Sequence, residues 1–381
     1  MSGPDRRPTV AGARVLVLGR SPEVLETVTQ ELAALGVAVQ GSTEAERAAG
    51  RFDAGEFDLI AFGGGLVGPV SERLKRDFAR QNPRVRFLDT YAPLAVRQIV
   101  DALEGREPEP PVDLDAYCDR IGYRGPRTPT IGTLRALHEL HPASIVFEAI
   151  DVLLGRGVDL SPAAVDAKMI RSRRGGYCFE QNGLFKRVLT AIGFEVESLV
   201  ARVRWMAPAG APPRPRTHMA LRVTVDGEPW LADVGFGGCV PTAPLRMDTA
   251  APQPTRHETF RVIPFGASLL VQARLDGTWL PLYELSREPQ LDVDYELANW
   301  FTATHPTSHF RRNLTVARAT PQARYALLDG RLTVRTPDGR TERRFLDADQ
   351  IERALSDTFA LPVEPDWRPV IERAAAAGAA A

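Results

Sequence analysis

Cysteine is scarce in this chain: three occur among 381 residues, and no two have paired spacing. Such a count argues against a disulfide framework and favours a reducing compartment. Charge of one sign is also lacking, because 47 basic and 48 acidic residues leave a formal net charge of −1. This balance gives no broad attraction to nucleic acid or to membranes. No apolar run approaches the roughly 18 residues of a membrane span, and the N-terminus lacks a signal-peptide core. We therefore expect a cytoplasmic protein.

Signatures of nucleotide binding are missing where the first third of the chain would place them. No GxGxxG motif follows the first predicted strand, and no GxxxxGK[ST] motif occurs. Apolar strand-like segments alternate with helical patterns instead, which predicts a doubly wound α/β domain with a parallel sheet over residues 1–105. We interpret Gly63, Gly64 and Gly65 as a tight strand-to-helix turn. The proline-rich segment REPEPP indicates a linker over residues 106–112.

The alternating pattern also resembles a response-regulator receiver domain. Receivers carry an acidic pair after the first strand and a phosphate-accepting aspartate at the end of the third. This chain has Gly19 and Arg20 in the first place and Gly63 in the second. The lysine near the end of the last strand is also missing, and Asp89, Thr90 and Tyr91 stand there. The resemblance implies a degenerate receiver that acts as an interaction or regulatory module and binds a protein partner.

The segment RRGGYCFEQN, residues 173–182, places Cys178 at the start of a predicted helix. Apolar residues in the following segment 183–192 have the spacing of one helical face. Unsatisfied N–H groups in a first helical turn carry partial positive charge, and Arg173 and Arg174 are expected to add to it. Both effects favour a thiolate, which is the nucleophilic form of cysteine. On position alone, a small buried cysteine is the simpler interpretation.

A histidine and a carboxylate follow on two predicted strands. Residues 217–225 alternate as a strand does, with His218 at the beginning, and residues 230–238 form an apolar strand that ends in Asp233 and a glycine-rich turn. The intervening VDGEP is a hairpin signal, so we expect adjacent antiparallel strands on which the two side chains meet. Alone, Asp233 would be a turn cap and His218 a strand histidine. With Cys178 they compose the set used in covalent acyl transfer.

These motifs, together with the later DYELANWFTATHPTSHFRRNL, resemble the arylamine N-acetyltransferase family from about Leu114 to about Val370. The resemblance implies that acetyl-CoA loads the nucleophile Cys178 and that the acetyl group then passes to an arylamine or hydrazine nitrogen. In that scheme His218 is the base and Asp233 the orienting acid. Ping-pong kinetics with an acetyl-cysteine intermediate would follow.

The same resemblance implies a fold for the last two thirds of the chain. It consists of a helical bundle, a β-barrel and an α/β lid around a cysteine-protease-like core. The whole chain would then be an α+β multidomain protein. The implied domain spans residues 113–375, divided into 113–200, 201–300 and 301–375. The alanine-rich tail is expected to fray.

The substrate pocket is predicted from the resemblance in part. Phe147, Phe236 and Phe310 match aromatic positions of family motifs and would line an apolar cleft for a flat arylamine, with ordinary core packing as the alternative. The chain departs from the family's PFENL motif at Val146 and Ala149, where proline and asparagine are usual. This departure bears on the entrance geometry and the substrate range.

Three glycines and two histidines complete the candidate site residues. Gly235, Gly237 and Gly238 would let the backbone approach coenzyme A, with a plain turn as the alternative. His305 and His309 have no acidic or cysteine partners at ligand spacing, so we expect no metal.

Alternative functions remain open at this point. An amide synthase that closes macrolactams would use the same three residues on a larger acyl group. A Cys–His hydrolase would use water as the acceptor. A regulatory protein that acts through its N-terminal domain is the third alternative, and the retention of Cys178, His218 and Asp233 argues against it.

Overall fold

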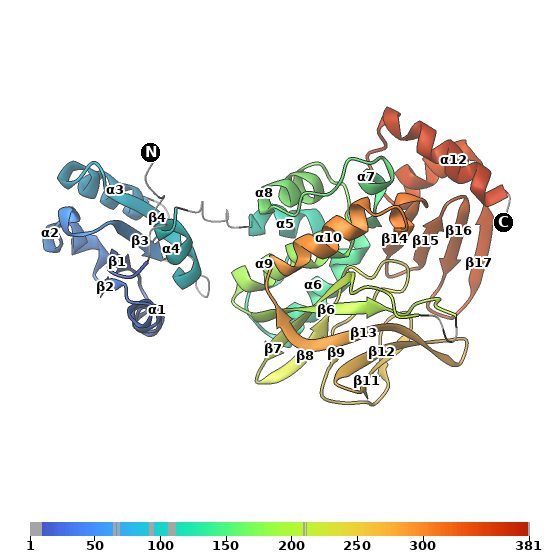
Figure 1. Ribbon diagram of the computed structural model, residues 1–381, viewed down its shortest axis with the longest axis horizontal. Helices are drawn as coiled ribbons and strands as arrows, with labels where there is room; N and C mark the ends of the chain where they lie inside the picture. The colour runs from blue at the N-terminus through green and yellow to red at the C-terminus, as the bar shows by residue number, and fades with distance from the viewer. Residues whose placement is uncertain are drawn as a thin grey trace, which may run out of the picture. The chain divides into compact units, whose positions relative to one another are not determined.

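The chain divides into two compact units, residues 1–110 and residues 111–381 (Figure 1). The computed structural model describes residues 10–63, 66, 69–90, 95–105, 112–208, 210 and 212–379. Gly64, Gly65, Tyr91 and most of the predicted linker at 106–112 lie outside the described residues.

The first unit contains a parallel four-stranded sheet in the order β2-β1-β3-β4. Such a sheet needs helical crossovers, and because helices cover both of its faces, the prediction of a doubly wound α/β fold is confirmed. The strands are β1 Arg14–Leu18, β2 Ala38–Ser42, β3 Leu59–Gly63 and β4 Arg86–Thr90.

Two apolar clusters cover the two faces of this sheet. Val15 and Val17 of β1 pack with helices α1 (Pro22–Ala34) and α4 (Ala95–Leu103). Leu16 and Leu18 point the other way and pack with α2 (Ala48–Arg51) and α3 (Pro69–Gln81). The continuous apolar run RVLVL is therefore explained by burial on both sides, as in other parallel sheets.

The second unit begins with helices that surround the start of α9. The elements are α5 Leu114–Ile121, α6 Ile131–Ser144, β5 Phe147–Glu148, α7 Ile150–Leu153, α8 Pro162–Val165, a π-helical turn Asp166–Arg171 and α9 Cys178–Ile192. The largest apolar cluster of the protein joins these helices to β6 and β7. Helix α9 is buried along most of its length, so its position is determined by packing on several sides.

An eight-stranded antiparallel sheet follows in the order β10-β11-β12-β13-β6-β7-β8-β9. Its strands are β6 Glu195–Val203, β7 His218–Val225, β8 Glu228–Ala232, β9 Leu245–Arg246, β10 Gln253–Pro254, β11 Thr259–Phe265, β12 Ser268–Leu275 and β13 Thr278–Gln290. The Gln253 side chain bridges the two edge strands through the backbone N–H and carbonyl of Arg246. This link nearly closes the sheet into the expected barrel. The barrel begins at Glu195, before the expected boundary at 201, because β6 follows α9 after a short turn.

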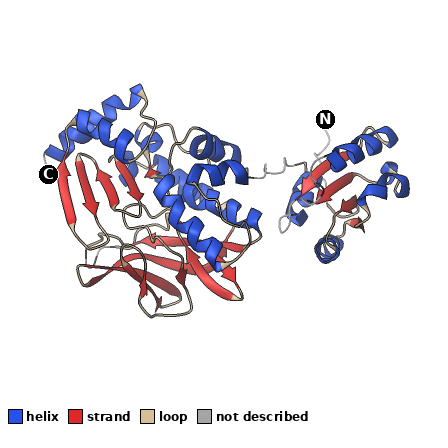
Figure 2. Ribbon diagram, turned by 180° about the vertical axis from the view of Figure 1, so that it is seen from behind, coloured by secondary structure: helices blue, strands red, loops and turns tan. Residues whose placement is uncertain are grey.

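The third part is a five-stranded antiparallel sheet, β17-β16-β15-β14-β5, with helices packed against it (Figure 2). Strands β14 Thr315–Ala319, β15 Arg324–Leu328, β16 Arg331–Arg335 and β17 Thr341–Phe345 are covered by α11 Ala348–Arg353 and α12 Arg368–Ala379. Helix α10, Asp294–Thr304, precedes them. Strand β5 belongs to the helical segment and ends at Glu148. It pairs with β14, which begins 167 residues later at Thr315.

As far as Ala379, the last residue that the structure describes, the alanine-rich tail does not fray as expected. Helix α12 continues to Ala379, Ala374 is buried, and Gly378 lies against Gly330. A Cβ built on Gly378 would stand 2.7 Å from the Cα of Gly330, so the small residues of the tail permit close packing of the helix on the turn between β15 and β16.

Candidate active site

Cys178 is the first residue of helix α9, as predicted. The two glycines before it are required by space. A Cβ on Gly175 would lie 2.1 Å from the carbonyl oxygen of Val146, and one on Gly176 would lie 2.7 Å from Oε2 of Glu180. The Gly-Gly turn therefore lets the chain pass tightly between β5 and α9 and deliver the cysteine to the helix start.

A buried carboxylate caps this helix start. Oε2 of Glu180 accepts a hydrogen bond of 3.0 Å from the backbone N–H of Tyr177, and Nζ of Lys168 lies 2.8 Å from Oε1. Burial raises the pKa of Glu180, although Lys168 opposes the rise. The cap holds the first turn of α9 in place, as a capping box does.

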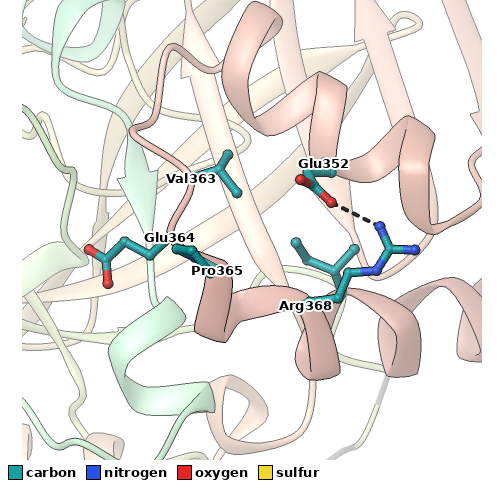
Figure 3. A pocket seen from close by; sticks show the side chains of 6 residues that line it. Glu352, Val363, Glu364, Pro365 and Arg368 are labelled. Carbon is teal, nitrogen blue, oxygen red and sulfur yellow. Dashed lines mark hydrogen bonds and ion pairs between the residues drawn. The ribbon is translucent and has the colours of Figure 1, made fainter.

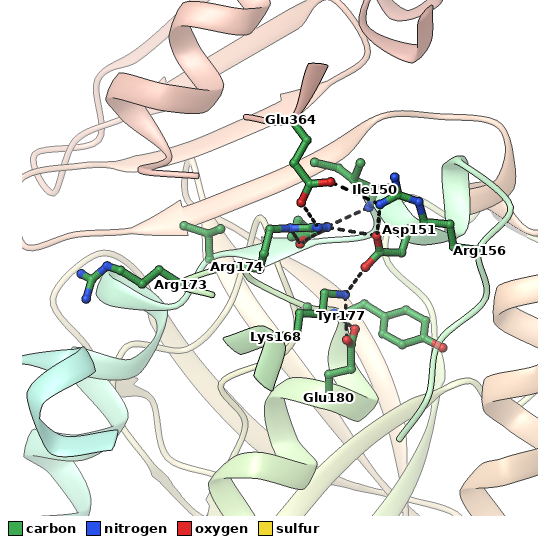
Figure 4. A network of polar contacts seen from close by, with 12 residues as sticks. Ile150, Asp151, Arg156, Lys168, Arg173, Arg174, Tyr177, Glu180 and Glu364 are labelled. Atoms are coloured by element: carbon green, nitrogen blue, oxygen red, sulfur yellow. Dashed lines mark hydrogen bonds and ion pairs between the residues drawn. The ribbon is translucent and has the colours of Figure 1, made fainter. Parts of the chain in front are cut away.

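The expected contribution of the two arginines to Cys178 is wrong. Arg174 is buried and pairs with Glu148 at 2.8 Å, with Asp151 at 3.3 Å and with Glu364 at 3.2 Å (Figure 4). Arg173 is exposed and points away from this network. The positive charge of Arg174 is matched by carboxylates, so of the two effects predicted from the motif only that of the helix start remains.

His218 and Asp233 meet across the β7–β8 hairpin. The hairpin prediction is confirmed: Leu221 pairs with Ala232, and the turn residues Asp226 and Gly227 have φ values of 53° and 77°, as a two-residue turn requires. Asp233 follows β8 directly and lies diagonally across from His218. Nε2 of His218 stands 2.7 Å from Oδ2 of Asp233, and both side chains are buried.

The electrostatics of this pair favour charge on both partners. Burial lowers the pKa of His218, but the negative charge of Asp233, its hydrogen bond and the interaction with Cys178 outweigh burial and raise the pKa to about 10. Burial likewise opposes ionisation of Asp233, yet His218 and the hydrogen-bond donors keep its pKa below the ordinary value. Nε2 of His218 faces the carboxylate, which leaves Nδ1 for the sulfur.

The three residues thus come together from α9, β7 and the end of β8. The sulfur of Cys178 lies 3.6 Å from the carbonyl oxygen of Thr217, the residue before His218. A Cβ on Gly235 would stand 2.9 Å from the Cα of Cys178, so the turn after Asp233 packs directly on the helix start. An imidazole between a thiol and a carboxylate can move the proton that acyl transfer requires.

Two residues that hold Asp233 by hydrogen bonds were not predicted from the sequence. The amide of Asn182 donates to Oδ1 of Asp233 at 3.0 Å and accepts from the N–H of Val234 at 3.0 Å. Nε2 of His138 accepts a hydrogen bond of 3.0 Å from the N–H of Asp233. Asn182 lies one helical turn after Cys178 in the quoted motif, which is a signal that the sequence offered. His138 carried no such signal, because its role depends on a contact 95 residues away.

The aromatic residues form two groups beside the reactive set. Phe147 and Phe310 lie together, with ring centroids 5.9 Å apart, and Tyr177 joins them at 5.9 Å from Phe310. Phe236 instead packs on His218, with centroids 5.2 Å apart. Gly237, with φ 76°, brings the backbone against the ring of Phe147, while Gly238 is exposed.

No group of three or more His, Cys, Asp or Glu side chains in the described ranges is arranged to hold a metal ion. His305 stacks on Phe301, and His309 packs beside Phe310. Within the same ranges, no helix combines the length and the apolar character needed to cross a bilayer.

Two cavities differ in their relation to Cys178. One of about 180 Å³ lies between α11 and α12, where Arg368 pairs with Glu352, and its lining contains no nucleophile (Figure 3). The other, of about 340 Å³, is lined by Val200, Thr217 and residues of α10. Thr217 also contacts the sulfur of Cys178 through its carbonyl oxygen, but Cys178, His218 and Asp233 are not among the residues that line the second cavity.

The second unit is similar in sequence to known acetyltransferases. A family model described as N-acetyltransferase matches residues 130–368. The arylamine N-acetyltransferase of Mycobacterium tuberculosis is 43% identical over 255 residues, which cover 66% of this chain and 90% of the relative. The arylamine N-acetyltransferase / N-hydroxyarylamine O-acetyltransferase of Salmonella typhimurium is 43% identical over 208 residues, covering 55% of this chain and 73% of that protein.

Solved structures agree. Mycobacterium marinum arylamine N-acetyltransferase has a TM-score of 0.66 at 42% identity, covering 69% of this chain and 98% of that chain. The structure of the same enzyme in complex with CoA has a TM-score of 0.66 at 41% identity, with the same coverage. The family match begins at residue 130 and therefore does not extend to the first unit. Through its second unit, the chain belongs to the arylamine N-acetyltransferase family and is an acyltransferase.

Proposed function

We propose that the second unit transfers an acetyl group from acetyl-CoA to the nitrogen of an arylamine or arylhydrazine, through an acetyl-Cys178 intermediate. The observation that carries the proposal is the charged His218–Asp233 pair beside the sulfur, with 2.7 Å between Nε2 and Oδ2. The M. marinum relative in complex with CoA supports coenzyme A as the carrier of the acyl group.

In the first half-reaction the thiolate of Cys178 attacks the carbonyl carbon of the thioester. The bond from that carbon to the sulfur of coenzyme A breaks, and the imidazolium of His218 supplies the proton that the departing thiolate takes up. The backbone N–H of Cys178, at the helix start, is the donor that we assign to the developing oxyanion. Exchange of one thioester for another is nearly isoenergetic, so this half-reaction is reversible.

In the second half-reaction the neutral amine attacks the acetyl carbon. The bond from this carbon to Cys178 breaks, and the neutral imidazole of His218 accepts the proton that the nitrogen releases. The enzyme thereby returns to its thiolate–imidazolium state. Phe147, Phe310 and Phe236 are the aromatic walls that we assign to the acceptor ring. Gly235, Gly237 and Gly238 stay predicted neighbours of coenzyme A, and of these Gly238 has the most open surroundings.

The test is the intact mass of the protein after incubation with acetyl-CoA. We expect one acetyl adduct in the wild type and none in Cys178→Ala, with release of the adduct when an arylamine is added. Cys118→Ala is the matched control, because Cys118 is also a free buried cysteine. A wild type without an adduct would refute the proposal, and loading only by larger acyl thioesters would favour the amide-synthase alternative.

A further inference from the structure

A buried ion pair joins the five-stranded sheet to the barrel, outside the reactive set. Arg324 is the first residue of β15 and is 4% exposed, and Glu258 stands just before β11 and is 5% exposed. Nη2 of the guanidinium donates a hydrogen bond to Oε2 of the carboxylate. Taking two charges out of water is costly, and such a pair stabilises a protein no more than apolar residues of similar size do. Stability alone therefore does not explain the pair.

Arg324 donates its other hydrogen bonds to the loop that follows Asp233. Nη1 lies 3.0 Å from the carbonyl oxygen of Gly238, and Nη2 lies 3.0 Å from that of Val240. A guanidinium presents its donors in a rigid planar fork, so one side chain fixes two carbonyls and a carboxylate at once. Glu258 supplies the opposite charge that a buried guanidinium requires. We call Arg324 and Glu258 the loop clamp.

The loop that the clamp holds, residues 234–240, packs against the reactive set. A Cβ on Gly235 would stand 2.9 Å from the Cα of Cys178, and the ring of Phe236 lies 5.2 Å from the imidazole of His218, between centroids. Three of the seven loop residues are glycines. Glycine loses more conformational freedom on folding than any other residue. The position of this loop therefore depends on its tertiary contacts.

The sheet that carries Arg324 contacts the loop at a second point. Phe147 pairs with Ala317 across β5 and β14, and Ala317 pairs with Ala326 across β14 and β15. Arg324 lies two residues before Ala326, so Phe147 and Arg324 project from the same face of the sheet. A Cβ on Gly237 would stand 3.3 Å from the ring of Phe147. One face of the five-stranded sheet thus supports the loop through a ring and a guanidinium.

We propose that the loop clamp is a positioning pair for the transfer of the acetyl group: it holds the loop against Cys178 and His218 in the geometry that loading by acetyl-CoA requires. The inference rests on the proposed function and adds two residues to it. Both side chains act through the loop, so the clamp governs the alignment of the thioester and not the charge state of Cys178. Loading is the sensitive step, because the loop glycines are also the predicted neighbours of coenzyme A.

The test separates the geometry of the clamp from its charges. Arg324→Met leaves Glu258 buried without its guanidinium and should lower the melting temperature whatever the function of the pair. The double variant Arg324→Met/Glu258→Leu replaces both charges by apolar side chains, and Arg335, the other neighbour of Glu258, keeps its pair with Asp276. This variant should melt within about 5 °C of the wild type. We expect its single-turnover acetylation of Cys178 by acetyl-CoA to slow by at least about tenfold.

Alkylation of Cys178 by iodoacetamide is the second measurement, because it requires the thiolate and no aligned thioester. The double variant leaves His218 and Asp233 unchanged, so we expect an alkylation rate within about twofold of the wild type. The matched control is Arg204→Met/Glu284→Leu, which removes an ion pair of 2.7 Å in the barrel, outside the loop. The control should keep both rates.

Slow loading with normal alkylation in a stable double variant supports the clamp. Loading at the wild-type rate in that variant overturns the inference. A parallel loss of loading and alkylation also overturns it, since the pair would then have a general structural role, and so does an equal loss of loading in the barrel control. A wild type that gains no acetyl group refutes the proposed function and the role in loading with it. Failure of the clamp alone is recognised by normal loading in the wild type, so the two failures are distinguishable.

Discussion

Replacing Asp233 by asparagine tests the charge pair at the centre of the site. The substitution keeps the shape of the side chain, and the surroundings determine how the amide must lie. Asn182 and the N–H of Gly235 both donate to Oδ1 at 3.0 Å, so the amide oxygen occupies that position. The amide NH₂ group then faces Nε2 of His218, which must accept a hydrogen bond. The imidazole is thereby held neutral, with its proton on Nδ1, toward Cys178.

The size of the effect follows from the pKa of His218. Burial lowers this pKa, and the charge of Asp233 is the first cause that raises it to about 10. Without that charge we expect burial to prevail and the pKa to fall below the ordinary value of 6.5. If the pKa of His218 falls by more than three, the imidazolium loses about 5 kcal/mol of stabilisation. Because the thiolate forms together with this imidazolium, we expect the rate of cysteine loading to fall on the order of a thousandfold.

The assay is the rate of alkylation of Cys178 by iodoacetamide, followed by intact mass between about pH 6 and pH 9. In the wild type we expect a rate that changes little with pH, because the imidazolium persists below about pH 10. In Asp233→Asn the reaction should be slow at pH 6 and accelerate as pH rises. Asp248→Asn controls for the substitution itself, since Asp248 is an exposed acid paired with Arg246. Wild-type alkylation of Asp233→Asn at pH 6 would refute the reasoning.

Four more outcomes are expected. Gly235→Ala should lower kcat/KM for acetyl-CoA by at least about tenfold, because its Cβ would stand 2.9 Å from the Cα of the nucleophile; an unchanged kcat/KM contradicts this. Lys168→Met should destabilise the protein by about 3 kcal/mol, since it leaves the buried capping carboxylate without its cation; the melting temperature checks it. The raised pKa of His218 adds stability that is complete below about pH 6.5 and is lost as pH rises through about 10, so urea unfolding should show a larger alkaline loss for the wild type than for Asp233→Asn. Deletion of residues 1–110, a separate compact unit, should leave turnover unchanged, and a soluble but inactive truncation would make that unit part of the catalytic machine.

The ion network around Arg174 links the helix start to the far end of the chain. Glu364 lies 190 residues after Arg174 in the sequence and pairs with it at 3.2 Å. The guanidinium also lies over the ring of Trp367, 4.6 Å from its centroid. Through Glu148 and Asp151 the same network reaches Lys168 and the cap of α9. The C-terminal segment thus supports the loop that delivers Cys178, which explains a motif arginine without any direct role at the sulfur.

Sequence alone was sufficient where the relevant interactions are local. The helix that begins at Cys178, the hairpin that carries His218 and Asp233, and the alternation of the first unit all follow from spacings of a few residues. Family resemblance added the order of the three reactive residues and the fold of the second unit, and both the fold and the family are confirmed by comparison. The roles of the individual site residues stay predictions.

Tertiary structure decided the features that depend on distant partners. The sequence placed Arg174 beside Cys178 but could not show that Glu148 and Glu364 would neutralise it. His138 reaches Asp233 across 95 residues, and Thr217 lines one cavity together with residues of α10 that lie far from it in the sequence. The physical reason is the same in each case: charge pairing and burial depend on three-dimensional proximity, which short-range periodicity does not encode.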